Sequence, residues 1–305
     1  MQTLLPSGIY PPLPTFFTDQ EELDLATLQQ HIRRLQDSGV AGYVLMGTNG
    51  EAVHLTNDER AQVIEAAREV IGNGDGDGDS LPLLAGCGDQ STRVTIAYCR
   101  QAAQCGADAA LILPPFYYKG RMDRTALIAH YRAVADDSPL PVLLYNMPGA
   151  SAGVDLDADI VCMLAEHPNI IGVKDSAGNI AKLALIVANV PATFRVFVGS
   201  ASYLLPALVV GAVGAVTALA NVFPHQVCFL QALFEAGELE EARSLQARII
   251  PANAAVTTIY SVPGLKAALE IVAGYGGKPR QPLQPLSLEE RNKLATILGA
   301  MPLET

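Results

Sequence analysis

The sequence predicts an α/β protein with a (β/α)8 fold, the TIM barrel, followed by a C-terminal helical extension. Short apolar runs alternate with amphipathic segments at regular intervals, which is typical of parallel βα units. Eight such runs occur within about 225 residues, close to the roughly 250 residues of a typical barrel. Each run is nearly continuous in Val, Ile, Leu or Ala, as expected for strands that are covered on both faces.

The eight apolar runs are the expected strands. In chain order they cover residues 8–13, 42–46, 81–85, 109–113, 141–145, 170–174, 195–198 and 212–218.

Amphipathic segments between these runs are the expected helices. The segment 25–35 carries apolar residues at helical spacing. Thr56 and Glu59 form a capping box, and the apolar positions that follow it lie on one helical face: Val63, Ile64, Ala67 and Val70. Three further helices are expected to start at residues whose side-chain oxygens can accept orphan backbone N–H groups: Ser91, Asp123 and Asp157.

Two segments complete the organisation. We expect a barrel that carries the active site over residues 1–223, and an eighth helix with a helical extension over 224–305, in the same structural unit. The glycine- and aspartate-rich segment 72–79 resembles a calcium loop and a dinucleotide-binding turn, but Ser80 and Gly86 occupy positions where the calcium loop needs Gly and Glu. We therefore interpret it as a solvated connection.

Composition excludes several classes of function. The chain of 305 residues has a net charge of −11, which argues against nucleic acid or an anionic membrane as partner. No apolar run is long enough to span a bilayer. The first ten residues show no targeting pattern, so a cytoplasmic location is expected. Five cysteines without a C-x-x-C pair and five scattered histidines suggest neither disulfides nor a metal site.

Lys174 is the most informative candidate residue. Catalytic side chains of such barrels stand at the C-terminal ends of strands, and Lys174 alone among the six lysines ends an apolar run. Desolvation favours a neutral amine, which attacks carbonyls to form a Schiff base. The alternative is a structural lysine paired with a carboxylate, either Asp175 or Glu51, and the position of Lys174 alone does not decide between these two roles.

Hydroxyl groups at neighbouring strand ends favour the catalytic interpretation. The phenol of Tyr145 could relay protons beside the imine carbon, and Thr48 and Tyr117 could complete a hydroxyl chain. Packing in the core is the alternative for each tyrosine taken singly. The backbone N–H groups of Thr48 and Asn49, in a glycine-flanked turn, form a candidate nest for a carboxylate.

Three motifs at these strand ends resemble the dihydrodipicolinate synthase/N-acetylneuraminate lyase family of Schiff-base aldolases. They are Gly47-Thr48-Asn49-Gly50-Glu51, Tyr145-Asn146-Met147-Pro148 and Gly172-Val173-Lys174-Asp175-Ser176. The similarity runs from Gly8 to about Leu286. It is greatest to two branches, the 4-hydroxy-2-oxoglutarate aldolases and the fungal 2-keto-3-deoxy-L-galactonate (L-threo-3-deoxy-hexulosonate) aldolases. The shared stretches begin at Tyr117, Ala218 and Pro251.

The resemblance implies a role for each matching position. Lys174 would be the Schiff-base nucleophile and Tyr145 the proton-transfer residue. Thr48 would belong to the relay and, with Asn49, bind the pyruvyl carboxylate. The relay tyrosine contributed across a subunit contact would be Tyr117. Because Tyr118 follows directly, the alignment leaves open which of the two matches the family's tyrosine.

The resemblance also implies that Ser176 and Gly199 line the substrate site, and that the protein is a metal-independent, cofactor-free homotetramer acting on a small 2-oxo acid. One departure concerns substrate choice. Dihydrodipicolinate synthases follow the tyrosine motif with Ser-Arg-Thr-Gly, whereas this chain has Gly149-Ala150-Ser151-Ala152-Gly153. Without the bidentate arginine, condensation of pyruvate with aspartate semialdehyde is disfavoured.

The leading hypothesis is therefore reversible cleavage of a 4-hydroxy-2-oxo acid to pyruvate and an aldehyde. Three alternatives remain: 4-hydroxy-tetrahydrodipicolinate synthase activity, N-acetylneuraminate lyase-like activity, and a catalytically dead pyruvate-binding barrel. The intact residues Lys174, Tyr145 and Thr48 count against the last of these.

Overall fold

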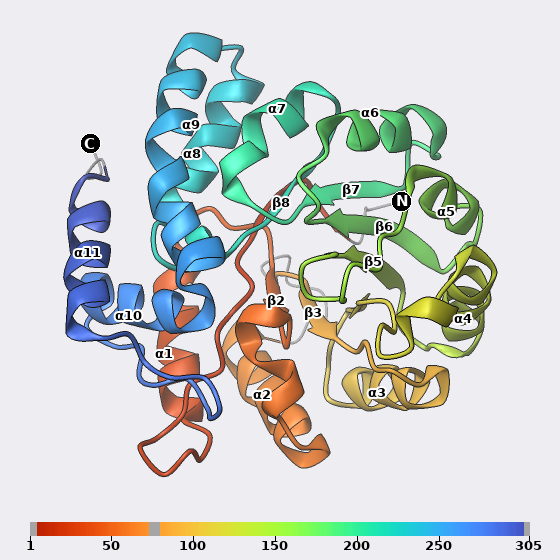
Figure 1. Cartoon of the computed structure of the whole chain (residues 1–305), viewed down its shortest axis with the longest axis horizontal. Helices are drawn as coiled ribbons and strands as arrows, with labels where there is room; N and C mark the ends of the chain where they lie inside the picture. The colour runs from red at the N-terminus through yellow and green to blue at the C-terminus, as the bar shows by residue number, and fades with distance from the viewer. Residues whose placement is uncertain (1–4, 73–79, 302–305) are drawn as a thin grey trace.

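Eight parallel strands form a barrel surrounded by helices (Figure 1). The computed structural model describes residues 5–72 and 80–301. The strands are β1 Gly8–Tyr10, β2 Tyr43–Leu45, β3 Leu83–Gly86, β4 Ala109–Ile112, β5 Val142–Asn146, β6 Ile170–Asp175, β7 Arg195–Val198 and β8 Gly214–Val216. Their order around the sheet is β1-β8-β7-β6-β5-β4-β3-β2. A parallel bridge between Pro12 and Val44 joins the two outermost strands, so the predicted barrel is confirmed.

Alternate strand residues belong to two cores, which explains the continuous apolar runs. In β2, Val44 points into the barrel, whereas Tyr43 and Leu45 pack against the surrounding helices. In β7, Phe197 is internal and Val198 external. Because side chains alternate across a strand and both faces are covered, every position must be apolar unless it has a specific polar partner.

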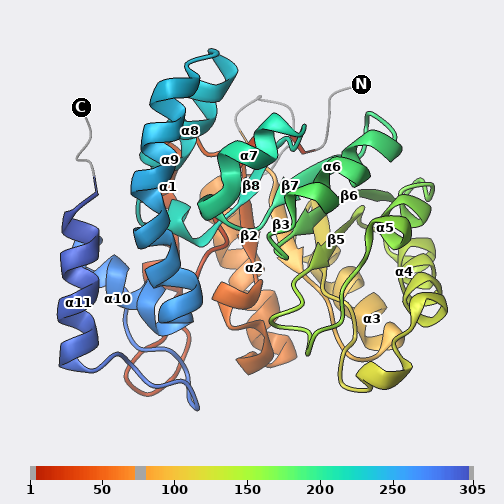
Figure 2. The same ribbon diagram turned by 45° about the horizontal axis from the view of Figure 1, so that its top comes forward.

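Helices link successive strands and cover the outside of the barrel (Figure 2). They are α1 Leu25–Gln36, α2 Asn57–Ile71, α3 Thr92–Gln104, α4 Arg124–Asp137, α5 Ala158–Leu164, α6 Ile180–Asn189 and α7 Leu204–Val209. The capping box of Thr56 and Glu59 is present at α2. Asp123 and Asp157 accept the expected backbone hydrogen bonds at α4 and α5.

One predicted cap is wrong. Helix α3 does begin after Ser91, but the side chain of Ser91 accepts no capping hydrogen bond. Thr95, one turn inside the helix, makes the local polar contacts instead. Its hydroxyl donates to Ser91 O and accepts from the N–H of Asp89.

The C-terminal part of the chain is helical, as expected. It comprises α8 Pro224–Glu235, α9 Leu239–Ala254, a π-helical segment Ala255–Ile259, α10 Ser261–Ala273 and α11 Leu288–Gly299. Helices α9, α10 and α11 lie together along one side of the barrel (Figure 1). Their buried apolar side chains, including Ile249, Leu265 and Leu294, belong to the same core as the barrel helices. The division after residue 223 stays a prediction.

Most of the predicted connection at 72–79 lies outside the described residues, which exclude 73–79. Within the part of the chain that the structure describes, no helix is both long and apolar enough to cross a membrane.

Candidate active site

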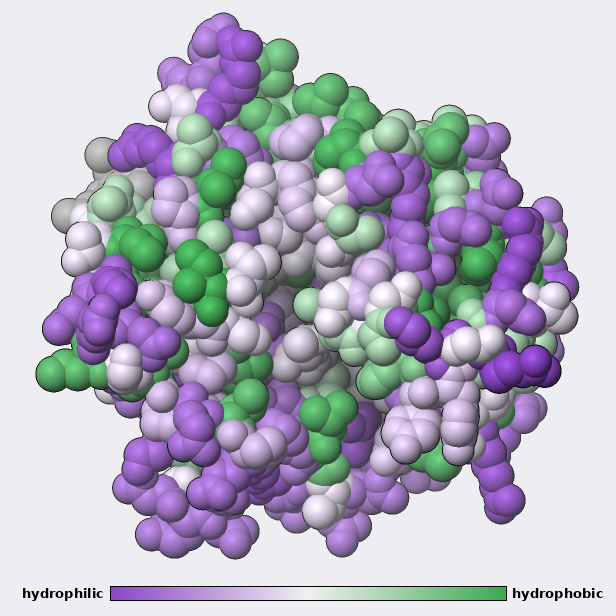
Figure 3. Space-filling view, viewed as in Figure 1, coloured by the Kyte–Doolittle hydropathy of each residue, from purple (hydrophilic) through white to green (hydrophobic). Residues whose placement is uncertain are grey.

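Strands β5, β6 and β7 place three side chains in one layer at the C-terminal end of the barrel. Tyr145 pairs in register with Lys174, which in turn pairs with Phe197. Residues opposite one another in parallel strands point to the same face of the sheet, and Tyr145 and Phe197 belong to the barrel interior. Lys174 therefore projects inward with them. The barrel lies beneath a hollow near the centre of the face in Figure 3.

The amine of Lys174 lies over an aromatic ring. Its Nζ is 3.9 Å from the ring centroid of Tyr145, and both side chains are buried, with exposed fractions of 4% for each residue. An aromatic face attracts a cation but cannot accept its proton. The ε-nitrogen thus contacts an aromatic ring, and no carboxylate of residues 5–72 and 80–301 forms an ion pair with it.

The ion-pair alternative for Lys174 is wrong. Asp175 pairs with Lys182 at 2.8 Å, and Glu51 pairs with Lys266 at 2.7 Å. Within residues 5–72 and 80–301, Lys174 takes part in no ion pair. Strand alternation gives the reason for Asp175, because the residue that follows an inward-pointing side chain points outward.

Two hydroxyls meet above the amine. Thr48 Oγ1, at the end of β2, lies 3.1 Å from Tyr145 Oη at the end of β5. Met147 Sδ lies 2.8 Å from Tyr145 Oη and 3.6 Å from Thr48 Oγ1, so it can accept from one hydroxyl while the other donates in the Thr48–Tyr145 bond. The structure thus brings together the predicted pair Thr48 and Tyr145. Met147 was missed, although it lies in the quoted tyrosine motif, because thioethers are weak acceptors.

Thr48 begins a short helical turn, Thr48–Gly50. The first internal hydrogen bond runs from the N–H of Gly50 to Gly47 O at 3.0 Å. The N–H groups that start a helical turn have no partner inside it, so those of Thr48 and Asn49 are placed to bind an anion such as a carboxylate. Glu51, which ends the turn, has φ 52°, a value that non-glycine residues rarely adopt.

Tyr117 does not reach these hydroxyls within one chain. Tyr117 and Tyr118 are 76% and 71% exposed, and their rings meet edge to face with centroids 5.0 Å apart. In the described chain neither phenol hydrogen-bonds to Thr48 or Tyr145. Gln90 Oε1 accepts the N–H groups of Phe116 and Tyr117 at 2.8 Å and holds this segment.

Ser176 and Gly199 lie against each other, and their role in lining the substrate site stays a prediction. A Cβ atom at residue 199 would stand 1.7 Å from Ser176 Oγ, so only glycine fits there. Backbone hydrogen bonds join the two strand ends, from the N–H of Gly199 to Asp175 O at 2.8 Å and from the N–H of Ser176 to Asn146 O at 2.7 Å.

A polar ring behind Lys174 was not predicted. Lys182 Nζ lies 2.8 Å from Asp155 and from Asp175, and Asn146 Nδ2 donates to the same two carboxylates. The ring ties the segment after β5 to the start of α6. A lysine on the buried face of an amphipathic helix, beside Leu183, was the available signal.

A second unpredicted cluster lies at the ends of β7 and β8. Asn253, from α9, donates to Ser200 Oγ at 2.9 Å and to Ser202 Oγ at 2.8 Å, and accepts from Thr217 at 3.3 Å. Asn253 belongs to a stretch shared with the resembling family, but its contacts depend on the placement of α9. Over the described ranges, no group of three or more His, Cys, Asp or Glu could hold a metal ion.

Comparison with known proteins agrees with this geometry. A model of the dihydrodipicolinate synthetase family matches residues 5–301. The chain is 43% identical over 283 residues to a probable mitochondrial 4-hydroxy-2-oxoglutarate aldolase of Emericella nidulans, covering 93% of this chain and 91% of the relative. It is 40% identical over 292 residues to an L-threo-3-deoxy-hexylosonate aldolase of Hypocrea jecorina, covering 92% and 91%. A dihydrodipicolinate synthase structure from Bacillus anthracis matches with TM-score 0.91 and 30% identity, covering 97% of this chain and 99% of that one.

Proposed function

The chain belongs to the dihydrodipicolinate synthetase family, as its motifs predict, and on this basis we propose that it is a Schiff-base aldolase. It cleaves a 4-hydroxy-2-oxo acid reversibly to pyruvate and an aldehyde. The observation that carries the proposal is the buried amine of Lys174, which lies 3.9 Å from the Tyr145 ring centroid and pairs with no carboxylate among residues 5–72 and 80–301.

The first step forms the imine. The neutral amine of Lys174 attacks C2 of the oxo acid, and the carbinolamine loses water to give a protonated imine. Burial excludes bulk water from this bond. The carboxylate of the substrate binds the N–H groups of Thr48 and Asn49, while Ser176 and Gly199 line the site next to the reacting carbons.

The second step breaks the C3–C4 bond. Tyr145 accepts the proton of the C4 hydroxyl as its own proton moves to Thr48, the aldehyde leaves, and the bonding electrons move onto the imine to give an enamine. Protonation at C3 and hydrolysis then release pyruvate and restore the amine. Thr48 is 3.1 Å from Tyr145 and passes the proton on, with Tyr117 of a second subunit completing the relay. The protonated imine is the electron sink, so the reaction needs no metal and no cofactor.

The substrate has a hydroxylated aldehyde portion. The relatives named above act on 4-hydroxy-2-oxoglutarate or a 3-deoxy-hexulosonate according to their names. The segment 149–153 carries no cation, and Lys119 from the β4–α4 connection donates to Ala152 O at 3.1 Å instead of facing a substrate. The arginine that dihydrodipicolinate synthases use here is thus missing, which does not favour aspartate semialdehyde. The far carboxylate of 4-hydroxy-2-oxoglutarate would need a cation from another segment.

Pyruvate release from a panel of 2-oxo acids tests the proposal. We expect turnover of 4-hydroxy-2-oxoglutarate or of a 2-keto-3-deoxy sugar acid in a coupled pyruvate assay, unchanged by strong chelators. We also expect irreversible inactivation by borohydride in the presence of pyruvate. Chelator-sensitive turnover restored by zinc would contradict the mechanism. Absence of borohydride trapping would favour a pyruvate-binding protein, and trapping without cleavage of any oxo acid would favour a synthase.

We further propose that the protein acts as a homotetramer built from dimers, with Tyr117 shared across a subunit contact. Light scattering of the purified protein tests the mass. The cytoplasmic location also stays a prediction, because the name of the Emericella nidulans relative carries the word mitochondrial.

A further inference from the structure

The turn that carries Thr48 is anchored by a buried charge cluster from distant parts of the chain. Helix α10 lies against this turn. Glu51, at the end of the turn, has a fully buried side chain, and its Oε1 forms an ion pair at 2.7 Å with Lys266, whose side chain is 1% exposed. Glu51 Oε2 accepts the backbone N–H of Arg280 at 2.9 Å and contacts His54 Nδ1 at 3.1 Å.

Apart from Glu51, the ammonium group of Lys266 contacts a backbone carbonyl and an aromatic ring. Its Nζ donates to Lys278 O at 2.9 Å and lies 4.5 Å from the ring centroid of Phe17. Burial lowers the pKa of Lys266, and the negative charge of Glu51 opposes this shift. A buried ammonium that loses its only carboxylate is strongly destabilised, so Lys266 and Glu51 hold each other in place.

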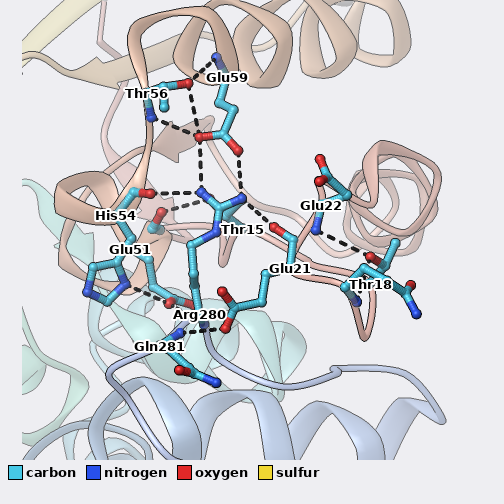
Figure 4. Close-up of polar contacts among 12 residues, drawn as sticks. Thr15, Thr18, Glu21, Glu22, Glu51, His54, Thr56, Glu59, Arg280 and Gln281 are labelled. Carbon is cyan, nitrogen blue, oxygen red and sulfur yellow. Dashed lines mark hydrogen bonds and ion pairs between the residues drawn. The ribbon is translucent and has the colours of Figure 1, made fainter.

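Arg280 extends the cluster to the segments around the turn (Figure 4). Its guanidinium binds both oxygens of Glu59 at the start of α2, at 2.6 and 3.0 Å, and donates to His54 O at 2.7 Å and to Glu21 O. Thr15 Oγ1 donates to Gly50 O at 2.7 Å from the other side. The turn is therefore fixed by α10 and by the segment before α11, in addition to its own strand.

These contacts account for the unusual backbone conformation of Glu51. A left-handed conformation at φ 52° persists only where surrounding contacts over-determine it. The Glu51 side chain is held by Lys266 and Arg280, while Thr48, three residues earlier, points toward Tyr145.

We propose that Glu51 and Lys266 are positioning residues, which set the Thr48 turn so that its hydroxyl meets Tyr145 and its N–H groups meet the substrate carboxylate. Neither touches the reacting atoms. The inference deepens the proposed function and rests on it. It assigns to the C-terminal helices a task in the reaction: they fix one wall of the site that the barrel strands alone leave unrestrained.

The test compares wild type with two variants. Glu51→Gln is nearly isosteric but leaves Lys266 charged and unpaired, so it can fail to fold. Glu51→Gln/Lys266→Met removes both charges, and replacing a buried pair in this way is often neutral for stability. In the double variant we expect kcat/KM to fall on the order of 10²-fold, divided between a lower kcat and a higher KM for the oxo acid.

A merely structural role predicts a different result. Loss of folded protein lowers kcat and leaves KM unchanged. The matched control is Arg68→Met, which breaks a pair of 2.6 Å with Asp108 directly before β4, at the opposite end of the barrel. It should lower the melting temperature without changing KM. A double variant with the wild-type KM overturns the proposal.

A crystal structure of the double variant tests, independently of activity, whether the Glu51–Lys266 pair positions the Thr48 turn. We expect the Thr48 Oγ1 to Tyr145 Oη separation, 3.1 Å here, to move beyond hydrogen-bonding distance. An unchanged separation overturns the positioning role. A wild-type protein that releases no pyruvate from any oxo acid would contradict the proposed function instead, and the structural comparison would still show whether the pair fixes the turn.

Discussion

Three buried lysines differ in what surrounds their ammonium groups. Lys182 lies between two carboxylates, and Lys266 pairs with Glu51. Lys174 faces the Tyr145 ring instead. The same side chain thus pairs with carboxylates at two positions and contacts an aromatic ring at the third.

This difference predicts where pyruvate is trapped. After reduction with borohydride, peptide mapping should place the pyruvyl adduct on Lys174, because only an uncharged amine attacks the carbonyl. Lys182 and Lys266 are equally buried internal controls in the same digest. An adduct on either of them would refute the assignment of the nucleophile.

Tyr145→Phe separates chemistry from packing. The ring keeps its place in the barrel interior, so the melting temperature should change little, whereas loss of the phenol should lower kcat about 10²–10⁴-fold. Tyr10→Phe is the matched control, because Tyr10 also lies in the interior core but donates to Pro6 O, away from the site. Normal turnover with a lowered melting temperature would make Tyr145 a packing residue.

At the scale of elements, the start of α2 is linked to the C-terminal segment through Glu59. Hydrogen bonds from the Arg280 side chain, and then from the Thr56 N–H, lower the pKa of Glu59 from 4.5 to about 2. A depressed pKa in the folded state stabilises the protein above the unfolded value, and this stabilisation is lost as pH falls from about 4.5 to about 2.

Melting temperatures of wild type and Glu59→Gln, measured across this pH range, test the contribution of Glu59 to stability. The variant should melt below wild type at pH 7, and the difference should shrink between about pH 4.5 and pH 2 as Glu59 becomes protonated. Glu65→Gln, on an exposed position of the same helix, controls for the loss of one negative charge. A difference that persists unchanged to pH 2 would assign the effect to capping geometry alone.

The short helix Lys119–Arg121 carries the cations nearest to the predicted face. Lys119 binds the neighbouring segment, which leaves Arg121 as the candidate contact for the far end of a substrate. Arg121→Ala should raise KM more for 4-hydroxy-2-oxoglutarate than for sugar-derived acids, since a charge-assisted contact contributes about 1.5–3 kcal/mol and a neutral one about 1. Arg124→Ala is the exposed control; equal losses for both substrates would assign Arg121 to the scaffold.

The sequence predicted what depends on local pattern. Apolar runs located all eight strands, and motif positions located Lys174, Tyr145 and Thr48. Long-range polar pairs could not be predicted, because the partners of Glu51 and Asp175 depend on where α10 and α6 dock. Ser91 shows a different limit: a residue type that often caps helices makes no capping hydrogen bond here, while Thr95 bonds to the backbone of Asp89 and Ser91.

At the scale of the whole molecule, three apolar side chains from connections between strands and helices are solvent-exposed in the single chain. Val53, Tyr117 and Tyr118 are exposed by 88%, 76% and 71%. Figure 3 shows further hydrophobic residues scattered over the visible face. A second subunit that covers them would bury this area and bring a phenol to a neighbouring site, as the proposed assembly requires.

Mixed oligomers test the shared tyrosine. Lys174→Ala and Tyr117→Phe should each be nearly inactive alone, but co-expression should restore activity, because a subunit with Lys174 then receives Tyr117 from its partner. Tyr118→Phe is the matched control, because it tests whether Tyr118 is the relay tyrosine instead of Tyr117. If co-expression of Lys174→Ala and Tyr117→Phe restores no activity, Tyr117 acts within its own subunit or has no part in catalysis.

The anchoring of the Thr48 turn has a consequence for biosynthesis. Glu51 and Arg280, which are joined by a hydrogen bond from the Arg280 backbone N–H to the Glu51 carboxylate, are separated by 229 positions in the chain. A ribosome therefore makes the turn early and its anchor late. The strand with Lys174 can leave the exit tunnel well before Lys266 and Arg280, so a growing chain can hold the reactive amine while the turn is still unfixed. Activity then begins only once nearly the whole polypeptide is in place.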